Sequence, residues 1–138
     1  MWQKLYDTLK DQGFTVIAIA MDSEADAARP WIEAVAPDYP ALIDRAHRVA
    51  ELYNMVNVPQ AAWIDEAGKI VRPAENAGAY EGFRAMDLET WTIPEDEVTA
   101  IVKAQATYFS AVADWVRYGA ACGHIYDADQ AKAHTSLP

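Results

Sequence analysis

The chain has 138 residues, of which 52% are hydrophobic, and its formal net charge is −10 at pH 7. This length supports one domain with a real core, and the apolar content is that of a globular protein rather than a disordered one. The acidic charge argues against nucleic acid and anionic membrane as partners, because both attract a basic surface. No stretch approaches the roughly 20 apolar residues of a membrane span, and no export signal opens the chain, so cytoplasm is the default localisation.

The first two segments have the patterns of a helix and a buried strand. Residues 2–12 are predicted to be helical because their apolar residues recur at helical spacing, and Gly13 suits the position after a helix. The apolar residues of that face are Trp2, Leu5, Tyr6 and Leu9. Residues 14–20 are nearly all apolar, which is typical of a strand in a parallel sheet with helices on both faces.

The next segments are shaped by prolines. We expect a turn at residues 24–28 and then a helix with Pro30 in its first turn, since proline disrupts a helix interior. That helix runs to Val35 or Ala36. A short strand at 41–44 and a helix at about 45–54 follow. The apolar residues of this last helix are expected to face inward: Val49, Leu52 and Tyr53.

Residues 57–73 have the pattern of a loop followed by a β-hairpin. Residues 61–64 are an apolar run of strand length, and residues 69–72 alternate polar and apolar as a half-buried strand does. Gly68 suits the connecting turn because it takes positive φ without a Cβ clash. Pro59 comes just before the first strand, and the Val58–Pro59 bond is a candidate cis peptide.

This Val-Pro, strand, Ile-Asp-x-x-Gly-x-Ile-Val string resembles the second half of a thioredoxin fold. It is most similar to the redoxin branch, which includes AhpC/TSA peroxiredoxins and ResA/TlpA-type thiol–disulfide oxidoreductases, and the resemblance runs from about Leu5 to Val71. The implied fold is α/β: a truncated, three-layer thioredoxin-like fold with a short mixed sheet and a long C-terminal helical extension. In that family the proline is cis and faces the active-site dithiol, and the matching residue here is Pro59.

The family also places a strand and a Cys-x-x-Cys ahead of the segments recognised here. This sequence holds one cysteine, Cys122, and no Cys-x-x-Cys. We therefore name no catalytic residue, and two classes of function stay open. The first is a thioredoxin-like binding or assembly module without redox catalysis. The second is a redoxin-type thiol–disulfide oxidoreductase or peroxidase remnant, or one that another polypeptide completes.

The remaining chain divides into an insertion and a helical extension. Residues 1–73 form the expected core, residues 74–93 a loop insertion, and residues 94–138 a helix and tail that pack on the same domain. Thr92 and Glu95 form the pattern of a capping box, and apolar spacing predicts a helix that ends near Tyr118, before Gly119. The tail from residue 120 onward is expected to contain a turn near 127–133.

Few residues have the surroundings that chemistry needs. Val58, Pro59 and Trp91 are the candidate binding residues. Trp91 lies in the long loop, where an exposed aromatic side chain marks a partner surface, whereas Trp31, Trp63 and Trp115 are predicted in the core. Cys122 is a candidate free thiol, but it follows a helix C-terminus, which disfavours a thiolate. We predict no metal and no cofactor. The metal-ligating types near Cys122 do not have the spacing of a familiar site: His124, Asp127 and Asp129.

The resemblance also bears on partners. The family's leading strand lies between the strands matched here by residues 14–20 and 61–64. Either these two strands pair directly, or a strand from another chain fills the edge, because an unpaired apolar edge promotes association. We predict a homodimer to which the 94–118 helix and the tail contribute, with a protein or peptide partner at the sheet edge as the related possibility.

Overall fold

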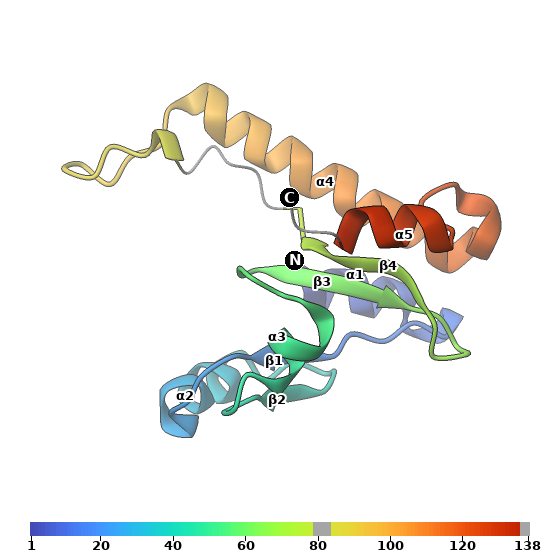
Figure 1. Cartoon of the computed structure of the whole chain (residues 1–138). Helices are drawn as coiled ribbons and strands as arrows, with labels where there is room; N and C mark the ends of the chain where they lie inside the picture. The colour runs from blue at the N-terminus through green and yellow to red at the C-terminus, as the bar shows by residue number, and fades with distance from the viewer. Residues whose placement is uncertain (79–83, 136–138) are drawn as a thin grey trace. The chain divides into compact units, whose positions relative to one another are not determined.

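The computed structural model describes residues 1–78 and 84–135. The chain divides into two compact units, Met1–Val56 and Asn57–Pro138, and each is described by itself. Helices and strands alternate in the order expected of an α/β protein, and a long helix follows them (Figure 1). None of the described helices combines the length and the apolar character that crossing a membrane requires.

The first unit opens with the predicted helix. Helix α1 spans Trp2–Leu9, and a 3-10 turn continues it over Lys10–Gln12. The turn ends at Gly13, whose φ of 79° lies in the left-handed region that favours glycine. Leu9 is fully buried, so the predicted apolar face does pack inward there.

Two short parallel strands follow in the same unit. Strand β1, Ala18–Ala20, pairs with β2, Ala41–Ile43, so that Ala18 is opposite Ala41 and Ala20 opposite Ile43. The strand predicted over residues 14–20 is therefore present but shorter. Its first residues lie outside the ladder, because β2 offers only three residues as partners.

Helix α2 differs from the prediction. It spans Ala25–Val35 and holds Pro30 in its interior, whereas a turn was expected at 24–28 and Pro30 in the first helical turn. A proline there removes one intrahelical donor, and this helix accommodates that loss. The helix ends at Ala36, whose φ of 44° is left-handed, and Pro37 follows.

Helix α3 is shorter than predicted. It spans Arg48–Tyr53, and the backbone N–H of Val49 donates to the Asp44 carboxylate across 2.6 Å. This contact holds the pKa of Asp44 below its usual range, the Val49 hydrogen bond being the largest cause. Leu52 was expected to face inward, but it is exposed, so that part of the prediction was wrong.

The second unit contains the predicted hairpin. Strand β3, Gln60–Ile64, pairs antiparallel with β4, Ile70–Asn76, which is longer than expected. In the turn the Asp65 carboxylate accepts the N–H of Ala67 at 3.0 Å and of Lys69 at 2.8 Å. Gly68 has a φ of 78°, so the sequence prediction for this turn is confirmed.

Within β4, Pro73 marks an irregularity in the pairing. Ala61 is opposite Glu75 while Trp63 is opposite Arg72, so one extra residue of β4 is accommodated between these pairs. Pro73 has no N–H to donate, and a bulge is where a strand tolerates that loss. The described strands form two two-stranded sheets, β1–β2 and β3–β4, and no ladder joins β1 to β3 among them. Direct pairing of 14–20 with 61–64 was one of two alternatives left open, and the described ladders do not include it.

Helix α4 confirms the longest helical prediction. It spans Glu95–Tyr118 and ends at Gly119. The predicted capping box does not form: Pro94 is the N-cap residue and no side chain caps the helix. The Thr92 hydroxyl instead lies 2.8 Å from that of Thr90.

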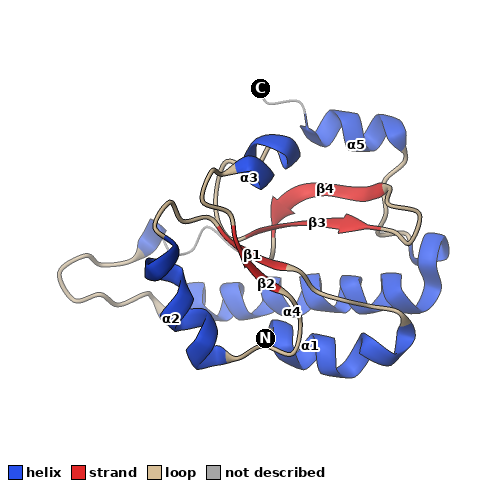
Figure 2. Cartoon of the chain, turned by 90° about the horizontal axis from the view of Figure 1, so that it is seen from below, coloured by secondary structure: helices blue, strands red, loops and turns tan. Residues whose placement is uncertain are grey.

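The C-terminal segment has more structure than the predicted turn. A 3-10 turn covers Gly119–Cys122, and helix α5 spans Ala128–Thr135. Helix α5 lies beside β4 (Figure 2). Residues 79–83 of the predicted loop insertion and residues 136–138 of the tail lie outside the described parts of the chain.

Candidate functional site

The loop that enters β3 contains the first two candidate binding residues. The Val58–Pro59 peptide bond is cis, and Val58 is 68% exposed. The Asn57 side chain accepts the Val58 N–H at 2.8 Å, and the Pro59 carbonyl accepts the N–H of Ala77 at 3.2 Å. The loop is thus tied to its own hairpin while it presents an apolar side chain to solvent.

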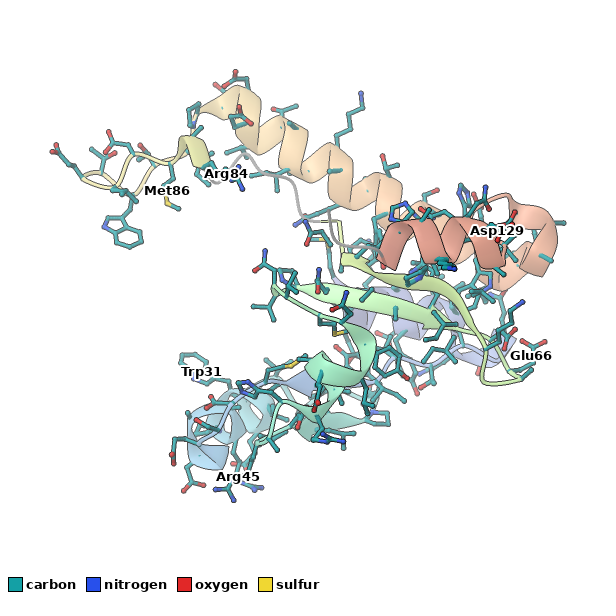
Figure 3. All side chains as sticks on the ribbon, viewed as in Figure 1. Trp31, Arg45, Glu66, Arg84, Met86 and Asp129 are labelled. Carbon is teal, nitrogen blue, oxygen red and sulfur yellow. The ribbon has the colours of Figure 1, made fainter. Side chains whose placement is uncertain are left out.

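Strand β3, which follows this loop, contributes Trp63 to the centre of an aromatic cluster. Trp63 is 4% exposed, and its indole N–H donates to the Tyr108 hydroxyl of α4 at 2.8 Å. Its ring stacks on Trp115, with centroids 5.2 Å apart and planes 22° from parallel. The predicted core role is confirmed for Trp63, while Trp115 is half-buried against it. It is wrong for Trp31, which is 76% exposed on α2 (Figure 3).

Arg72 extends this cluster to the C-terminal segment. Its guanidinium carbon lies 5.0 Å from the Trp63 ring centroid and 4.8 Å from that of Tyr126. It forms a two-pronged ion pair with Glu75, one arm of which spans 3.1 Å, and donates to the His124 carbonyl at 2.7 Å. Burial acts to lower the pKa of Arg72, but the hydrogen bond and charge of Glu75 outweigh it, so the pKa is raised.

The C-terminal segment adds backbone contacts to the same strand. The Tyr126 N–H donates to the Val71 carbonyl at 2.8 Å, and the Tyr126 ring stacks on His134 with centroids 4.7 Å apart. Sequence reasoning missed this arrangement. Arg72 and Glu75 are three residues apart, a spacing that puts side chains on opposite faces of a regular strand, so the pattern did not predict their ion pair. The aromatic partner Tyr126 is contributed from a distant part of the chain.

Cys122 lies at the end of the 3-10 turn that follows α4, where it is half-buried. Its sulfur accepts the backbone N–H of His124 at 3.2 Å, and the imidazole of His124 lies 3.6 Å from the Asp114 carboxylate. No described group of three His, Cys, Asp or Glu residues is placed to hold a metal ion.

Trp91, the third candidate binding residue, is 76% exposed and lies in a loop that its own hydrogen bonds close. The described contacts do not bring Trp91 together with Val58, Pro59 or Cys122. The four predicted residues therefore fall into three places: the loop before β3, the loop before α4, and the turn after α4.

The buried cluster is built to hold structure, because its polar atoms are paired with one another. Of the predicted site residues, Val58, Pro59 and Trp91 are exposed and can meet a ligand from solution.

The sequence of the first half of the chain matches a known protein family. The AhpC/TSA family matches residues 1–72, which include α1 to β3 and the first residues of β4. No curated protein and no solved structure matches the chain. Since the match covers 72 of 138 residues, the chain belongs to the AhpC/TSA family and has the thioredoxin-like α/β fold of that family.

Proposed function

We propose that residues 1–138 act as a binding and assembly module of the AhpC/TSA family rather than as a thiol–disulfide exchanger. The observation that carries the proposal is the sparse core of the first unit. Among the described residues of Met1–Val56, Leu9 is the only buried large hydrophobic. Seven large hydrophobic residues of this unit are exposed: Met1, Ile17, Trp31, Val35, Leu42, Leu52 and Val56.

Exposed apolar surface of this extent is costly. Each fully buried side chain of this kind contributes roughly 1.5–3 kcal/mol relative to its exposed state, so a partner that covers several of them gains substantial binding free energy. The gain grows with the number of these side chains that one partner covers. This supports association as a function of the module.

Strand β1 supports a specific mode of association. Hydrogen bonds from Ala18 to the Pro40 carbonyl and from Asp44 to the Ala20 carbonyl use one edge of β1. The backbone N–H and C=O groups of Ile17 and Ile19 alternate with those of Ala18 and Ala20 and therefore belong to the opposite edge of β1. The described ladders place no strand at that edge. A two-stranded sheet of three-residue strands is marginal alone, so an added strand stabilises it.

We infer that a second copy of this chain occupies that edge, which makes the module a homodimer. An edge strand of another polypeptide would satisfy the same backbone groups. Light scattering at micromolar concentration tests the inference, and the homodimer predicts about twice the chain mass of 15.3 kDa. A single-chain mass would contradict the homodimer.

The surroundings of the thiol support a role outside exchange. Dithiol exchange needs an attacking thiolate and a resolving thiol, and the sequence holds one cysteine. The Cys122 sulfur is already engaged with the His124 N–H, at the end of a turn of the second unit.

The second candidate function is a redoxin-type oxidoreductase or peroxidase whose other reactive sulfur is supplied by another polypeptide, and the family match over residues 1–72 favours it. Insulin reduction with dithiothreitol and consumption of hydrogen peroxide separate the two functions. The binding module gives no rate above reductant alone. A rate above that background, abolished by Cys122→Ser, would establish thiol chemistry in this chain and overturn the proposal.

A further inference from the structure

The loop that precedes α4 is held in one conformation by its own polar groups. The Asp87 N–H donates to the Thr92 carbonyl at 2.9 Å, which closes the loop. The Asp87 carboxylate accepts the N–H groups of Glu89 at 2.8 Å and Thr90 at 3.1 Å. We call residues 87–92 the 87–92 loop. Because these bonds fix it in advance, binding through the loop costs little ordering entropy.

The 87–92 loop presents its two large apolar residues to solvent. Leu88 is 74% exposed and Trp91 is 76% exposed. Figures 1 and 3 show the segment extending away from the start of α4, with Met86 at its beginning. An exposed indole on a preformed turn is of the residue type that most often anchors protein interfaces, and Leu88 adds exposed apolar surface in the same loop.

The backbone at Trp91 adds a second observation. Its φ is 54°, in the left-handed region that asparagine and glycine adopt readily and a bulky aromatic residue does not. Strained positions of this kind concentrate at ligand-binding sites. Trp91 is thus both exposed and strained, and the two observations together favour a role in contacts with other molecules.

The negative charge around Leu88 and Trp91 restricts the kind of molecule that can bind them. Residues 84–97 contain five carboxylates and one basic residue, a formal charge of −4 (1 − 5). The carboxylates are Asp87, Glu89, Glu95, Asp96 and Glu97. Backbone hydrogen bonds, that of Glu89 first, hold the pKa of Asp87 below its usual range, so this carboxylate stays ionised at neutral pH.

We infer that the 87–92 loop docks on a basic amphipathic helix of a partner protein. The apolar face of such a helix receives Leu88 and Trp91, and the lysines or arginines that border that face meet Asp87 and Glu89. Charge complementarity of this kind selects the partner and speeds its association. It disfavours an anionic membrane, and it disfavours a second copy of this chain, whose own net charge is −10. This inference deepens the proposed binding function and rests on it.

The probe is a fluorescein-labelled synthetic helical peptide of leucine and lysine with one apolar face, and binding is followed by fluorescence anisotropy. A peptide with glutamate in place of every lysine is the charge control. Trp91→Asn removes the indole and leaves a residue suited to the left-handed backbone. Trp31→Asn is the matched control, since both tryptophans are 76% exposed.

We expect Trp91→Asn to weaken binding by about tenfold or more, as loss of an interface anchor does, and Leu88→Asn to weaken it in the same direction. Trp31→Asn changes it by less than about twofold, the glutamate peptide does not bind, and added salt lowers the affinity. Equal effects of Trp91→Asn and Trp31→Asn would show non-specific attraction to an acidic chain and overturn the inference. Trp91-dependent binding to vesicles of zwitterionic lipid would overturn it in favour of a membrane.

Light scattering of the same variants separates this inference from homodimer formation. Trp91→Asn is expected to keep the mass of the unmodified chain, because the homodimer is assigned to β1. A loss of dimer mass in Trp91→Asn would make the loop a contact between copies and contradict the partner inferred here. An unchanged dimer mass with lost peptide binding supports both inferences.

Discussion

The hydrogen bond between Trp63 and Tyr108 is the most informative single contact of the second unit. The indole N–H and the phenol oxygen are 2.8 Å apart, and both side chains are buried. Tyr108→Phe removes the acceptor and leaves a buried donor unpaired, which costs about 1–3 kcal/mol. Urea unfolding measures the loss. Tyr118→Phe, on an exposed side chain, is the control and is expected to change stability by less than about 0.5 kcal/mol.

The same tyrosine predicts how stability depends on alkaline pH. Burial raises the pKa of Tyr108 from 10.0 to about 12, although the Trp63 hydrogen bond acts to lower it. Above pH 10 the unfolded chain loses this proton first, so stability is complete below pH 10 and falls as pH rises toward 12. The higher pKa of Tyr108 in the folded state contributes at most about 3 kcal/mol to the free energy of unfolding.

Unfolding free energies measured between pH 9 and 12 test this dependence. We expect the difference between the unmodified chain and Tyr108→Phe to shrink over that range, because the variant lacks the titrating hydroxyl. A constant difference across the range would show that Tyr108 titrates alike in the folded and unfolded states.

At the scale of elements, Arg72 joins the C-terminal segment to the hairpin. One guanidinium contacts the Trp63 and Tyr126 rings, pairs with Glu75 and donates to the His124 carbonyl. Lysine keeps the charge but lacks the planar fork that these contacts use together.

Arg72→Lys is therefore expected to loosen the C-terminal segment from β4. Hydrogen exchange of the Tyr126 amide measures this loosening, because that N–H donates to the Val71 carbonyl of β4. The Tyr126 amide should exchange faster by about tenfold in the variant. Arg117→Lys on the exposed end of α4 is the control, and equal exchange in the two variants would show that Arg72 does not hold the segment.

The close approach of β4 to α4 depends on Gly78. A Cβ built there would lie 3.0 Å from Gln105 Cα and 3.2 Å from Tyr108 Cβ, and its φ is 71°. Gly78→Ala therefore combines backbone strain with a steric clash and is expected to cost about 2 kcal/mol or more. Gly68→Ala has a similar φ of 78° with open space around it, so it isolates the strain, at about 1 kcal/mol. Equal decreases in the free energy of unfolding for the two variants would show that the predicted clash at Gly78 does not contribute.

Sequence patterns predicted the features that depend on residues close together in the chain. The hairpin turn followed from Asp65 and Gly68, and the end of α4 followed from Gly119. The interior position of Pro30 did not follow, because the rest of α2 tolerates the lost donor. The Arg72 cluster and the exposure of Trp31 could not be predicted, since both depend on which distant surfaces meet. The exposed Val58 and Trp91 were named as candidates, but their separate locations came from the fold.

At the scale of the whole molecule, the family match and the sparse core of the first unit both favour association. The AhpC/TSA match covers residues 1–72, while the first unit buries little of its own apolar surface and leaves one edge of β1 without a ladder partner among the described strands. An incomplete core and an open strand edge are both relieved by association. The net charge of −10 opposes association of two copies, so strand pairing and apolar contact at β1 must outweigh that repulsion in the homodimer.

The most direct test is the mass of an edge-blocked variant. Ile17→Lys places a charge beside the outer edge of β1, as natural edge strands do to prevent pairing, and Gln12→Lys adds the same charge outside the strand. Light scattering at micromolar concentration should give about twice 15.3 kDa for the unmodified chain and for Gln12→Lys, and about 15.3 kDa for Ile17→Lys. A single-chain mass for all three, or a dimer that Ile17→Lys leaves intact, would contradict assembly through β1.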